Sequence, residues 1–332
     1  MSETSKCVLA IDLGSSGPKI SVVDRNGDIL ATRSGVFKSI YVEHGRGVEQ
    51  DAEEWWTQIL QLSKEVIEES GTADRIVAIG NCAQYFSSIP VDEKGNAVHN
   101  CIMWEDSRSS KHISKVMGGF PSIMGYNIFK LLRWLISVGI PPILLGVDGS
   151  SHMLLIRNEM PEVWKKAYKI LEPSDFISMK LTGKFQTNEN NGFAYSMIRK
   201  AAWSKGTYNK TLVKYLGLDI DKYPEILPVG ADLGSPLKEV VDYLGLTQNV
   251  SVFSGMQDTT ACMLGGGAFD DYDAVIEIGT TLNTGVVVPK RIIDILSGIY
   301  SVSSPVKDKF IMVGEPGAGA KSLNYLLNNL LR

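Results

Sequence analysis

The chain opens with short apolar runs separated by small polar loops, a pattern typical of strands joined by tight turns. The runs are VLAIDL, KISVVD and the stretch GDILATRSGVF, which together span residues 8–42. Between the second and third runs lies Asn26-Gly27, a pair that favours a two-residue hairpin turn. We therefore predict an antiparallel three-stranded opening.

The pattern then changes to helical spacing. Residues 51–70 begin with an Asp that can cap a helix, carry acidic residues in the first turn and stop before Gly71. We assign the acids of this segment to the helix dipole rather than to a catalytic carboxylate pair. A buried strand, RIVAIGNCA, follows, so we expect a mixed sheet with helices on its faces.

The middle of the chain, about residues 110–250, is predicted to be mainly helical with Gly and Pro breaks. It includes MPEVWKKAYKIL (160–171) and LVKYLGL (212–218). Buried-strand patterns return at NVSVFSG (249–255) and DAVIEIG (273–279). The order of elements thus suggests sheet structure at both ends and helices between.

An internal repeat links the two ends. AIDLGSSGPKISVV (10–23) matches VIEIGTTLNTGVVV (275–288) position by position: acid, aliphatic, Gly, two hydroxyl residues, a short loop and then aliphatics. Two similar strand-loop-strand units predict two similar domains that face one another.

Composition limits the function. The 332 residues are 44% hydrophobic and 21% charged, which is ordinary for a globular protein with room for two domains. A formal net charge of −4 with scattered Lys and Arg provides no basic stripe for a phosphate backbone, so we expect no nucleic-acid partner. The four cysteines, which form no C-x-x-C pair, are predicted to be reduced thiols in a cytoplasm: Cys7, Cys82, Cys101 and Cys262.

No targeting or membrane-spanning segment is predicted. The polar N-terminus lacks the charged head and long apolar stretch of a signal peptide. The most hydrophobic segment, 131–147, contains Arg133 and the pair Pro141-Pro142, which a spanning helix tolerates poorly. We therefore expect a cytoplasmic protein without a membrane partner.

The first loop has the composition of a phosphate site. Gly14 lets the backbone approach a ligand closely, and Ser15 and Ser16 add hydroxyl donors. Asp12 would repel a phosphate unless a cation lay between, so the order of residues makes most sense with Mg²⁺, and Lys19 could neutralise a transferring group. The alternative is a tight hairpin whose serines satisfy turn amides. The second copy of the pattern favours the functional interpretation.

The chain resembles the FGGY carbohydrate kinases, which share an ATP-binding fold with actin and the hexokinases. The segments that carry the resemblance are AIDLGSSGPK, GVEQDAEEWW, IVAIGNCAQYFSSIPVDEKGNAVHNCIMWEDSR, EPSDFISMKLTG, FSGMQDTTACMLGGG and VIEIGTTLN. GVDGSSHMLLIRNEMPEVW further resembles a xylulokinase-like branch. The resemblance implies an actin-like, ribonuclease H-like two-domain α/β fold with mixed sheets flanked by helices. The sugar-binding domain would cover 1–260, and a nucleotide-binding domain would begin at 261–332.

The resemblance also implies site residues for phosphoryl transfer from ATP with Mg²⁺. Asp258 matches the family's general base, although an Asp in that place could equally cap a helix, whose N-terminus would hold its pKa down. Asp12, through water, would organise Mg²⁺ with the first loop and Lys19. The second phosphate motif would be Gly279, Thr280 and Thr281.

For the sugar, the resemblance points to two segments: Gln84, Tyr85, Phe86 and Ser87, and then Trp104, Asp106 and Arg108. The alternative for the second segment is a surface ion pair beside a core tryptophan. Xylulokinases usually have Gln-Met-His-Gly in the first segment, so this chain lacks the histidine contact. We expect a small sugar or polyol substrate, with a ketopentose such as xylulose favoured, and the rival is a non-catalytic sugar-binding protein.

Two expectations concern geometry. Pro18 removes a ladder donor where the second strand should begin, which would shorten the hairpin. The sequence ends after one more strand (309–315) and an apolar helix, so we expect an incomplete second domain of about three strands. Its exposed leucine face would promote self-association, and a homodimer is one arrangement that we consider: Leu326, Leu327, Leu330 and Leu331.

Overall fold

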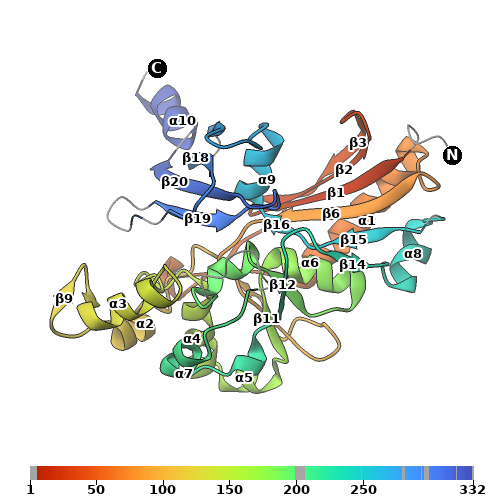
Figure 1. Cartoon of the computed structure of the whole chain (residues 1–332). Helices are drawn as coiled ribbons and strands as arrows, with labels where there is room; N and C mark the ends of the chain where they lie inside the picture. The colour runs from red at the N-terminus through yellow and green to blue at the C-terminus, as the bar shows by residue number, and fades with distance from the viewer. Residues whose placement is uncertain are drawn as a thin grey trace. The chain divides into compact units, whose positions relative to one another are not determined.

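The structure is a computed structural model that describes residues 6–198, 206–247, 249–278, 281–292, 294, 299–318 and 320–330, with the backbone alone at 281 and 315–324. Two compact units divide the chain, Met1–Gln257 and Asp258–Arg332. Figure 1 shows the elements of both, and each unit is described by itself.

Unit 1 is built on a mixed seven-stranded sheet. Its main path runs β14-β15-β6-β1-β2-β3, and β16 also pairs with β6. The strands are β1 (Cys7–Gly14), β2 (Gly17–Asp24), β3 (Ile29–Ser34), β6 (Ile76–Ala83), β14 (Asp232–Gly234), β15 (Ser251–Phe253) and β16 (Met256–Gln257). β1 and β2, like β2 and β3, are antiparallel, whereas β6 runs parallel to β1. The predicted antiparallel opening and the mixed sheet are confirmed.

Shorter strand pairs surround this sheet. They are β4 (Ile40–Val42), β5 (Gly47–Gln50) and β8 (Cys101–Ile102) in one sheet, and the pairs β7 (Ile89–Val91) with β11 (Lys169–Leu171), β9 (Ser122–Ile123) with β10 (Tyr126–Asn127), and β12 (Gln186–Asn188) with β13 (Glu225–Leu227). The helices are α1 (Ala52–Ser70), α2 (Ser110–Met117), α3 (Ile128–Ser137), α4 (Gly149–Glu159), α5 (Pro161–Lys166), α6 (Pro173–Thr182), α7 (Lys210–Leu216) and α8 (Lys238–Leu244). Among the described residues, no helix has the length and apolar character needed to cross a bilayer.

Local signals explain the first elements. The turn after β2 is closed by Asp24, whose Oδ1 accepts the N–H groups of Asn26 at 2.8 Å and Asp28 at 3.0 Å. Helix α1 begins at the predicted cap, because Asp51 Oδ1 accepts the Glu53 N–H at 2.8 Å. It ends at Gly71, which has the left-handed φ of 61° that glycine adopts without strain.

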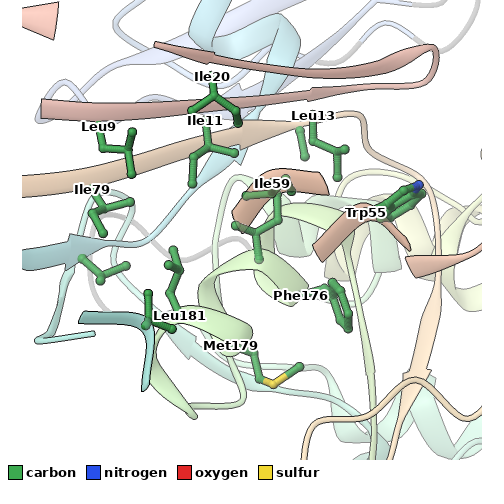
Figure 2. Close-up of a cluster of buried hydrophobic side chains, with 14 of the residues drawn as sticks. Leu9, Ile11, Leu13, Ile20, Trp55, Ile59, Ile79, Phe176, Met179 and Leu181 are labelled. Atoms are coloured by element: carbon green, nitrogen blue, oxygen red, sulfur yellow. The ribbon is translucent and has the colours of Figure 1, made fainter. Parts of the chain in front are cut away.

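The core of unit 1 lies on one face of the main sheet. Alternate residues of β1 and β2 point into it, which places Asp12 and Lys19 on the opposite face. Helix α1 packs against β2 and β3, and α6 packs against β6. Figure 2 shows side chains of β1, β2 and β6, of α1 and of α6 in this cluster: Leu9, Ile11, Leu13, Ile20, Trp55, Ile59, Ile79, Phe176, Met179 and Leu181.

The predicted helix over 160–171 is wrong in its second half. Helix α5 stops at Lys166, and residues 169–171 form β11, which pairs antiparallel with β7. Ile170 and Leu171 are fully buried in that pairing. Burial of two aliphatic side chains and closure of a ladder with a distant segment outweigh the local helical preference.

Unit 2 contains helix α9 (Asp258–Gly265), an antiparallel four-stranded sheet and helix α10 (Ala320–Asn329). The sheet order is β17 (Ala274–Ile278), β18 (Thr281–Val288), β20 (Phe310–Ala318) and β19 (Tyr300–Ser303), one strand more than expected. The expectation that β17 is buried is wrong, because Ile276 and Ile278 are exposed on this edge strand. On α10 three of the four named leucines are exposed, and the last lies outside the described residues: Leu326, Leu327, Leu330 and Leu331.

Both copies of the predicted repeat form antiparallel strand pairs. In the first copy Asp12 lies opposite Lys19, and Gly14 opposite Gly17. In the second copy Glu277 lies opposite Asn283 and accepts its side-chain N–H at 3.0 Å. When the copies are aligned by sequence, their registers differ by one residue.

Candidate functional site

The first predicted phosphate loop is a tight turn whose carbonyl groups are held by the scaffold. Ser15 and Ser16 form the two-residue connection between Gly14 and Gly17. The Ser15 carbonyl accepts the Gln50 side-chain N–H at 2.8 Å, and the Ser16 carbonyl accepts the Phe37 N–H at 3.0 Å. Ser16 is exposed and Ser15 half-buried. The loop is therefore fixed from behind, while its serines remain accessible.

Glycine is required at the end of this turn. A Cβ on Gly17 would lie 2.0 Å from the carbonyl oxygen of Gly35. Pro18 does not shorten the hairpin, contrary to expectation, since β2 already starts at Gly17. The Pro18 carbonyl accepts the Gly35 N–H at 2.9 Å on the β3 side. The N and C=O of one strand residue point to the same side, so the donor that proline lacks is missing from the β3 side and not from the β1 ladder.

Asp12, half-buried on the face opposite the core, is the carboxylate closest in sequence to this loop. Its Oδ1 accepts a hydrogen bond from Cys82 Sγ at 3.6 Å, and the exposed Lys19 lies opposite it in the ladder. Among the described residues there is no cluster of three or more His, Cys, Asp or Glu that could hold a metal ion. A cation here would thus rest on one carboxylate, which is the usual arrangement for Mg²⁺ that keeps waters and binds phosphate oxygens.

The predicted sugar segment after β6 contains a buried amide whose side-chain atoms have no partner in the described part of the chain. Gln84 is 4% exposed, and its backbone N–H reaches the Leu13 carbonyl at 2.9 Å. Its side-chain Oε1 and Nε2 are buried and have no hydrogen-bond partner in the described part of the chain. Burial of an unpaired amide is costly, so this side chain is suited to a polar ligand.

Two aromatic residues follow Gln84. Phe86 adopts a left-handed φ of 57°, a conformation that is strained for a residue with a bulky side chain. Its ring lies 4.9 Å from that of Tyr85 and 6.2 Å from that of Phe193, between centroids. Both side chains are half-buried. They form an apolar wall beside the Gln84 amide.

A buried acid that the sequence did not single out supports this loop. Glu172 is 1% exposed, precedes α6, and accepts the Ser87 N–H on Oε2 at 3.4 Å. Burial raises the pKa of Glu172 well above its ordinary value, and nearby Asp175 adds to the effect. Ser87 Oγ in turn accepts the backbone N–H of Trp104 at 3.1 Å. Ser87 thereby links the two predicted sugar segments, and Glu172 holds Ser87 in place.

Trp104 is 38% exposed, whereas the two charged residues after it are buried. Arg108 Nε bonds both oxygens of Asp106, at 3.1 and 2.9 Å, and Nη2 bonds Asp106 Oδ2 and Glu49 Oε1, each at 2.7 Å. Asp106 Oδ2 also accepts the Val48 N–H at 3.1 Å. The alternative of a surface ion pair is wrong, because Asp106 and Arg108 are buried. The charges form a buried triad that holds the segment bearing Trp104.

Asp258 is the first residue of α9 and is half-buried. Its Oδ1 accepts the N–H of the next residue, Thr259, at 2.7 Å. Of the second phosphate motif, Gly279 and Thr280 lie outside the described residues, and Thr281 begins β18, where it pairs with Ala318.

A network of buried amides fixes the strand that leads to Asp258. Asn190 Oδ1 accepts the Gln257 N–H at 2.8 Å, and Gln257 Nε2 donates to the Asn190 carbonyl at 2.8 Å. Asn188 Nδ2 donates to the Gly255 carbonyl at 2.6 Å. The run TNENN at 187–191, with three asparagines in five residues, is the sequence signal for this network, and no role was assigned to it from the sequence.

Comparison with known proteins gives consistent matches. Residues 7–265 match the FGGY family of carbohydrate kinases, N-terminal domain. A xylulose kinase of Staphylococcus epidermidis is 27% identical over 328 residues, which cover 96% of this chain and 60% of that protein. A xylulose kinase of Lactococcus lactis is 26% identical over 324 residues, with 96% and 60% coverage. The chain thus spans 60% of the length of these relatives.

Solved structures agree on the fold. A ligand-bound xylulose kinase from Lactobacillus acidophilus superposes with a TM-score of 0.84 at 19% identity, over 98% of this chain and 63% of that one. A Plasmodium falciparum glycerol kinase with ADP gives a TM-score of 0.81 at 19% identity, over 98% and 64%. At these identities the superpositions establish the two-domain sugar kinase fold alone. Since the family match covers most of the sequence, the chain belongs to the FGGY family of carbohydrate kinases.

Proposed function

We propose that this chain belongs to an enzyme that transfers the terminal phosphoryl group of ATP to a hydroxyl of a small sugar or polyol. The match of residues 7–265 to the kinase family carries the proposal. A ketopentose such as xylulose is the favoured substrate, because the relatives that span nearly all of this chain are named xylulose kinases. The missing histidine in the Gln84–Ser87 segment is the feature of the sequence that weighs against that particular sugar.

Gln84 and Trp104 are the proposed sugar contacts. The amide of Gln84 has a donor and an acceptor that are buried and unpartnered, so sugar hydroxyls would satisfy both. Trp104 offers a flat apolar face for the C–H groups of the sugar, and Tyr85 and Phe86 extend that apolar wall. We assign Asp106 and Arg108 to holding Trp104, because their polar atoms already bond one another and Glu49.

The turn after β1 is the proposed phosphate site. The hydroxyl groups of Ser15 and Ser16 can donate to phosphate oxygens. The carbonyl groups of the same two residues, which would repel a phosphate, instead accept hydrogen bonds from Gln50 and Phe37. Asp12 would hold Mg²⁺ through water, and Lys19 would offset charge on the transferred group. When bound, Mg-ATP would supply the phosphoryl group, and its Mg²⁺ would offset the negative charge of the phosphate oxygens. Gly279, Thr280 and Thr281 remain the proposed second motif.

Asp258 is the proposed general base that accepts the proton of the attacking hydroxyl. It stands at the N-terminus of α9, where the helix dipole favours the ionised carboxylate. The buried amides around Gln257 hold the preceding strand in one conformation. A carboxylate that directly follows a fixed strand loses little entropy when it meets the substrate. The rival proposal is a sugar-binding member of the family that lacks catalysis.

Ligand-dependent stability tests the proposal. We would measure melting temperatures with xylulose, other pentuloses, pentitols and glycerol, each with and without Mg-ATP. A ligand at 100 times its Kd stabilises the native state by about 2.7 kcal/mol, which raises the melting temperature by several degrees. Gln84→Ala should abolish the sugar shift, whereas Gln61→Ala, at an exposed position on α1, should keep it. A sugar shift without a nucleotide shift would favour the rival, and no shift with any sugar would refute both proposals.

A further inference from the structure

A projecting part of unit 1 exposes an unusual amount of apolar surface. We call it the α3 lobe: the hairpin β9–β10, helix α3 and the loop that follows, residues 119–147. Figure 1 shows β9 and α3 projecting from the helical part of unit 1. Phe120 is 94% exposed, Ile136 76% and Phe129 68%. Other large apolar side chains of the lobe are also exposed: Ile123, Met124, Leu132 and Leu145. Such a patch normally marks an interaction surface.

The lobe presents these side chains from a well-fixed scaffold. Asn127 caps α3, since its Oδ1 accepts the N–H groups of Phe129 and Lys130 at 3.1 Å each. Lys130 Nζ donates to the last carbonyls of α2, at 2.6 Å to Val116 and 2.8 Å to Gly118. Trp134, on the opposite side of α3 from the exposed residues, is fully buried. The apolar surface therefore belongs to the folded state and is not a frayed end.

The charge of the surroundings restricts the partner. The chain contains no Asp or Glu between Asp106 and Asp148. Lys115 and Arg133 are exposed there, and the Arg133 guanidinium lies 5.2 Å from the ring of Tyr215 on α7. Helix α7 adds the exposed Lys210 and Lys214.

One acid faces the basic residues of α2, the helix that packs beside the lobe. Glu159 of α4 pairs with Lys111 at 2.7 Å and also bonds His112, so it neutralises that lysine. Asp148 accepts the N–H of Ile143 in the lobe's loop but is 0% exposed, so the exposed charged side chains of residues 107–147 are all basic. A partner that fits this surface is consequently anionic and offers an apolar layer beneath its charge.

A second copy of the chain fits poorly. An isologous interface would bring the same patch onto itself, which sets Arg133 and Lys115 of one copy against those of the other. A projecting lobe also buries little area against an identical projection, and stable interfaces need roughly 1,200 Å² or more. A helix with large apolar side chains on its exposed face, flanked by exposed basic residues of neighbouring helices, is instead typical of contact with a lipid surface.

We propose that the α3 lobe docks on the surface of anionic phospholipid bilayers. Phe120, Phe129 and Ile136 enter the boundary between headgroups and acyl chains, while Lys115 and Arg133 lie at the lipid phosphates. This is a surface contact that needs no spanning helix. The proposal departs from the expectation from the sequence that the protein has no membrane partner, which rested on the lack of a spanning segment.

Vesicle co-sedimentation tests the proposal with the whole chain. The probes are 100-nm vesicles of phosphatidylcholine alone and of phosphatidylcholine with phosphatidylglycerol in a 7:3 ratio. We expect binding to the anionic vesicles only, and loss of that binding as salt screens the charges. Lys115→Gln and Arg133→Gln should each lower the partition coefficient about five-fold. Phe129→Ser and Ile136→Ser should each lower it ten-fold or more.

Matched variants separate the lobe from general surface effects. Ile29→Ser changes an equally exposed isoleucine of β3, and Lys94→Gln changes an exposed lysine of a distant turn, so both should bind as the parent does. Melting temperatures of all variants should agree, because the changed side chains are exposed. Equal binding to neutral and anionic vesicles, or no binding to either, would overturn the proposal. Self-association in sedimentation velocity that Ile136→Ser abolishes, without vesicle binding, would assign the lobe to an interface between copies.

Discussion

Replacement of Arg108 by alanine tests the buried triad directly. The guanidinium supplies four hydrogen bonds of 2.7–3.1 Å to Asp106 and Glu49. Asp106 is 0% exposed and Glu49 6%, so Arg108→Ala leaves two carboxylates buried without their counter-charge. Stability should therefore fall much more than for an exposed pair.

Removal of one partner from a buried ion pair costs about 3–5 kcal/mol, because the charge that remains has lost both its counter-ion and its solvent. Arg46→Ala is the matched control. Its guanidinium lies 3.9 Å from Glu43, and both side chains are about half exposed. An exposed pair of this kind contributes about 0–1 kcal/mol. The two arginine variants should thus differ by about 2–5 kcal/mol in the free energy of unfolding.

Urea unfolding followed by tryptophan fluorescence measures the difference, and calorimetric titration with sugar follows on the same samples. If Arg108 only stabilises the triad, Arg108→Ala should unfold at a lower urea concentration than the parent. Any loss of sugar affinity would then arise because the segment around Trp104 is less ordered. A direct sugar contact predicts the reverse: an affinity lower by about 1.5–3 kcal/mol with an unchanged midpoint. If Arg108→Ala and Arg46→Ala unfold at the same urea concentration, the reasoning from burial is wrong.

Three further changes test other parts of the structure. Burial raises the pKa of Asp175 to about 7, so the folded state binds a proton on this carboxyl more tightly than the unfolded state does. The stability that this protonation contributes is fully present below about pH 4 and is lost as the pH rises to about 7. Asp175→Asn, which can still accept the bond from Asn191, should therefore be more stable than the parent at pH 8 by up to roughly 4 kcal/mol, with a smaller gap at pH 5; parallel melting curves at both pH values would contradict this. Gly17→Ala should destabilise unit 1 by about 1–3 kcal/mol through the clash with Gly35, whereas Gly80→Ala, where a Cβ meets nothing within 4 Å, should unfold close to the parent; equal unfolding midpoints would refute the clash. In a preparation with measurable kinase activity, Asp258→Asn should slow turnover by about 10²–10⁴ at nearly constant sugar affinity; near-normal turnover would leave that residue as a helix-end aspartate only.

Features set by neighbouring residues could be predicted from the sequence. The three opening strands, the Asn26-Gly27 turn and the cap of α1 at Asp51 all depend on contacts a few residues apart. Pattern and turn chemistry suffice for such elements. The same local logic failed for β11, because its partner β7 lies far back in the sequence.

The chemistry of the sugar segment depended even more on distant contacts. Nothing in the sequence indicated that Glu49 bonds Arg108, or that Glu172 accepts the backbone N–H of Ser87. In each case the two residues are brought together only by the packing of separate elements. The sequence singled out Asp106 and Arg108 beside Trp104, but the fold was needed to show that their charges bond one another.

The one-residue difference in register between the two repeat hairpins has a consequence for their divergence. Descent from a common ancestral segment would leave Asp12 and Glu277 as equivalent positions, yet the first carboxylate lies across from a lysine and the second bonds an asparagine amide. A slip of one position turns each side chain of a strand toward the other face of its sheet. Consider a chimera in which the loop of one copy replaces the aligned residues of the other. Its loop would have the residue types of the first copy but the cross-strand neighbours of the second.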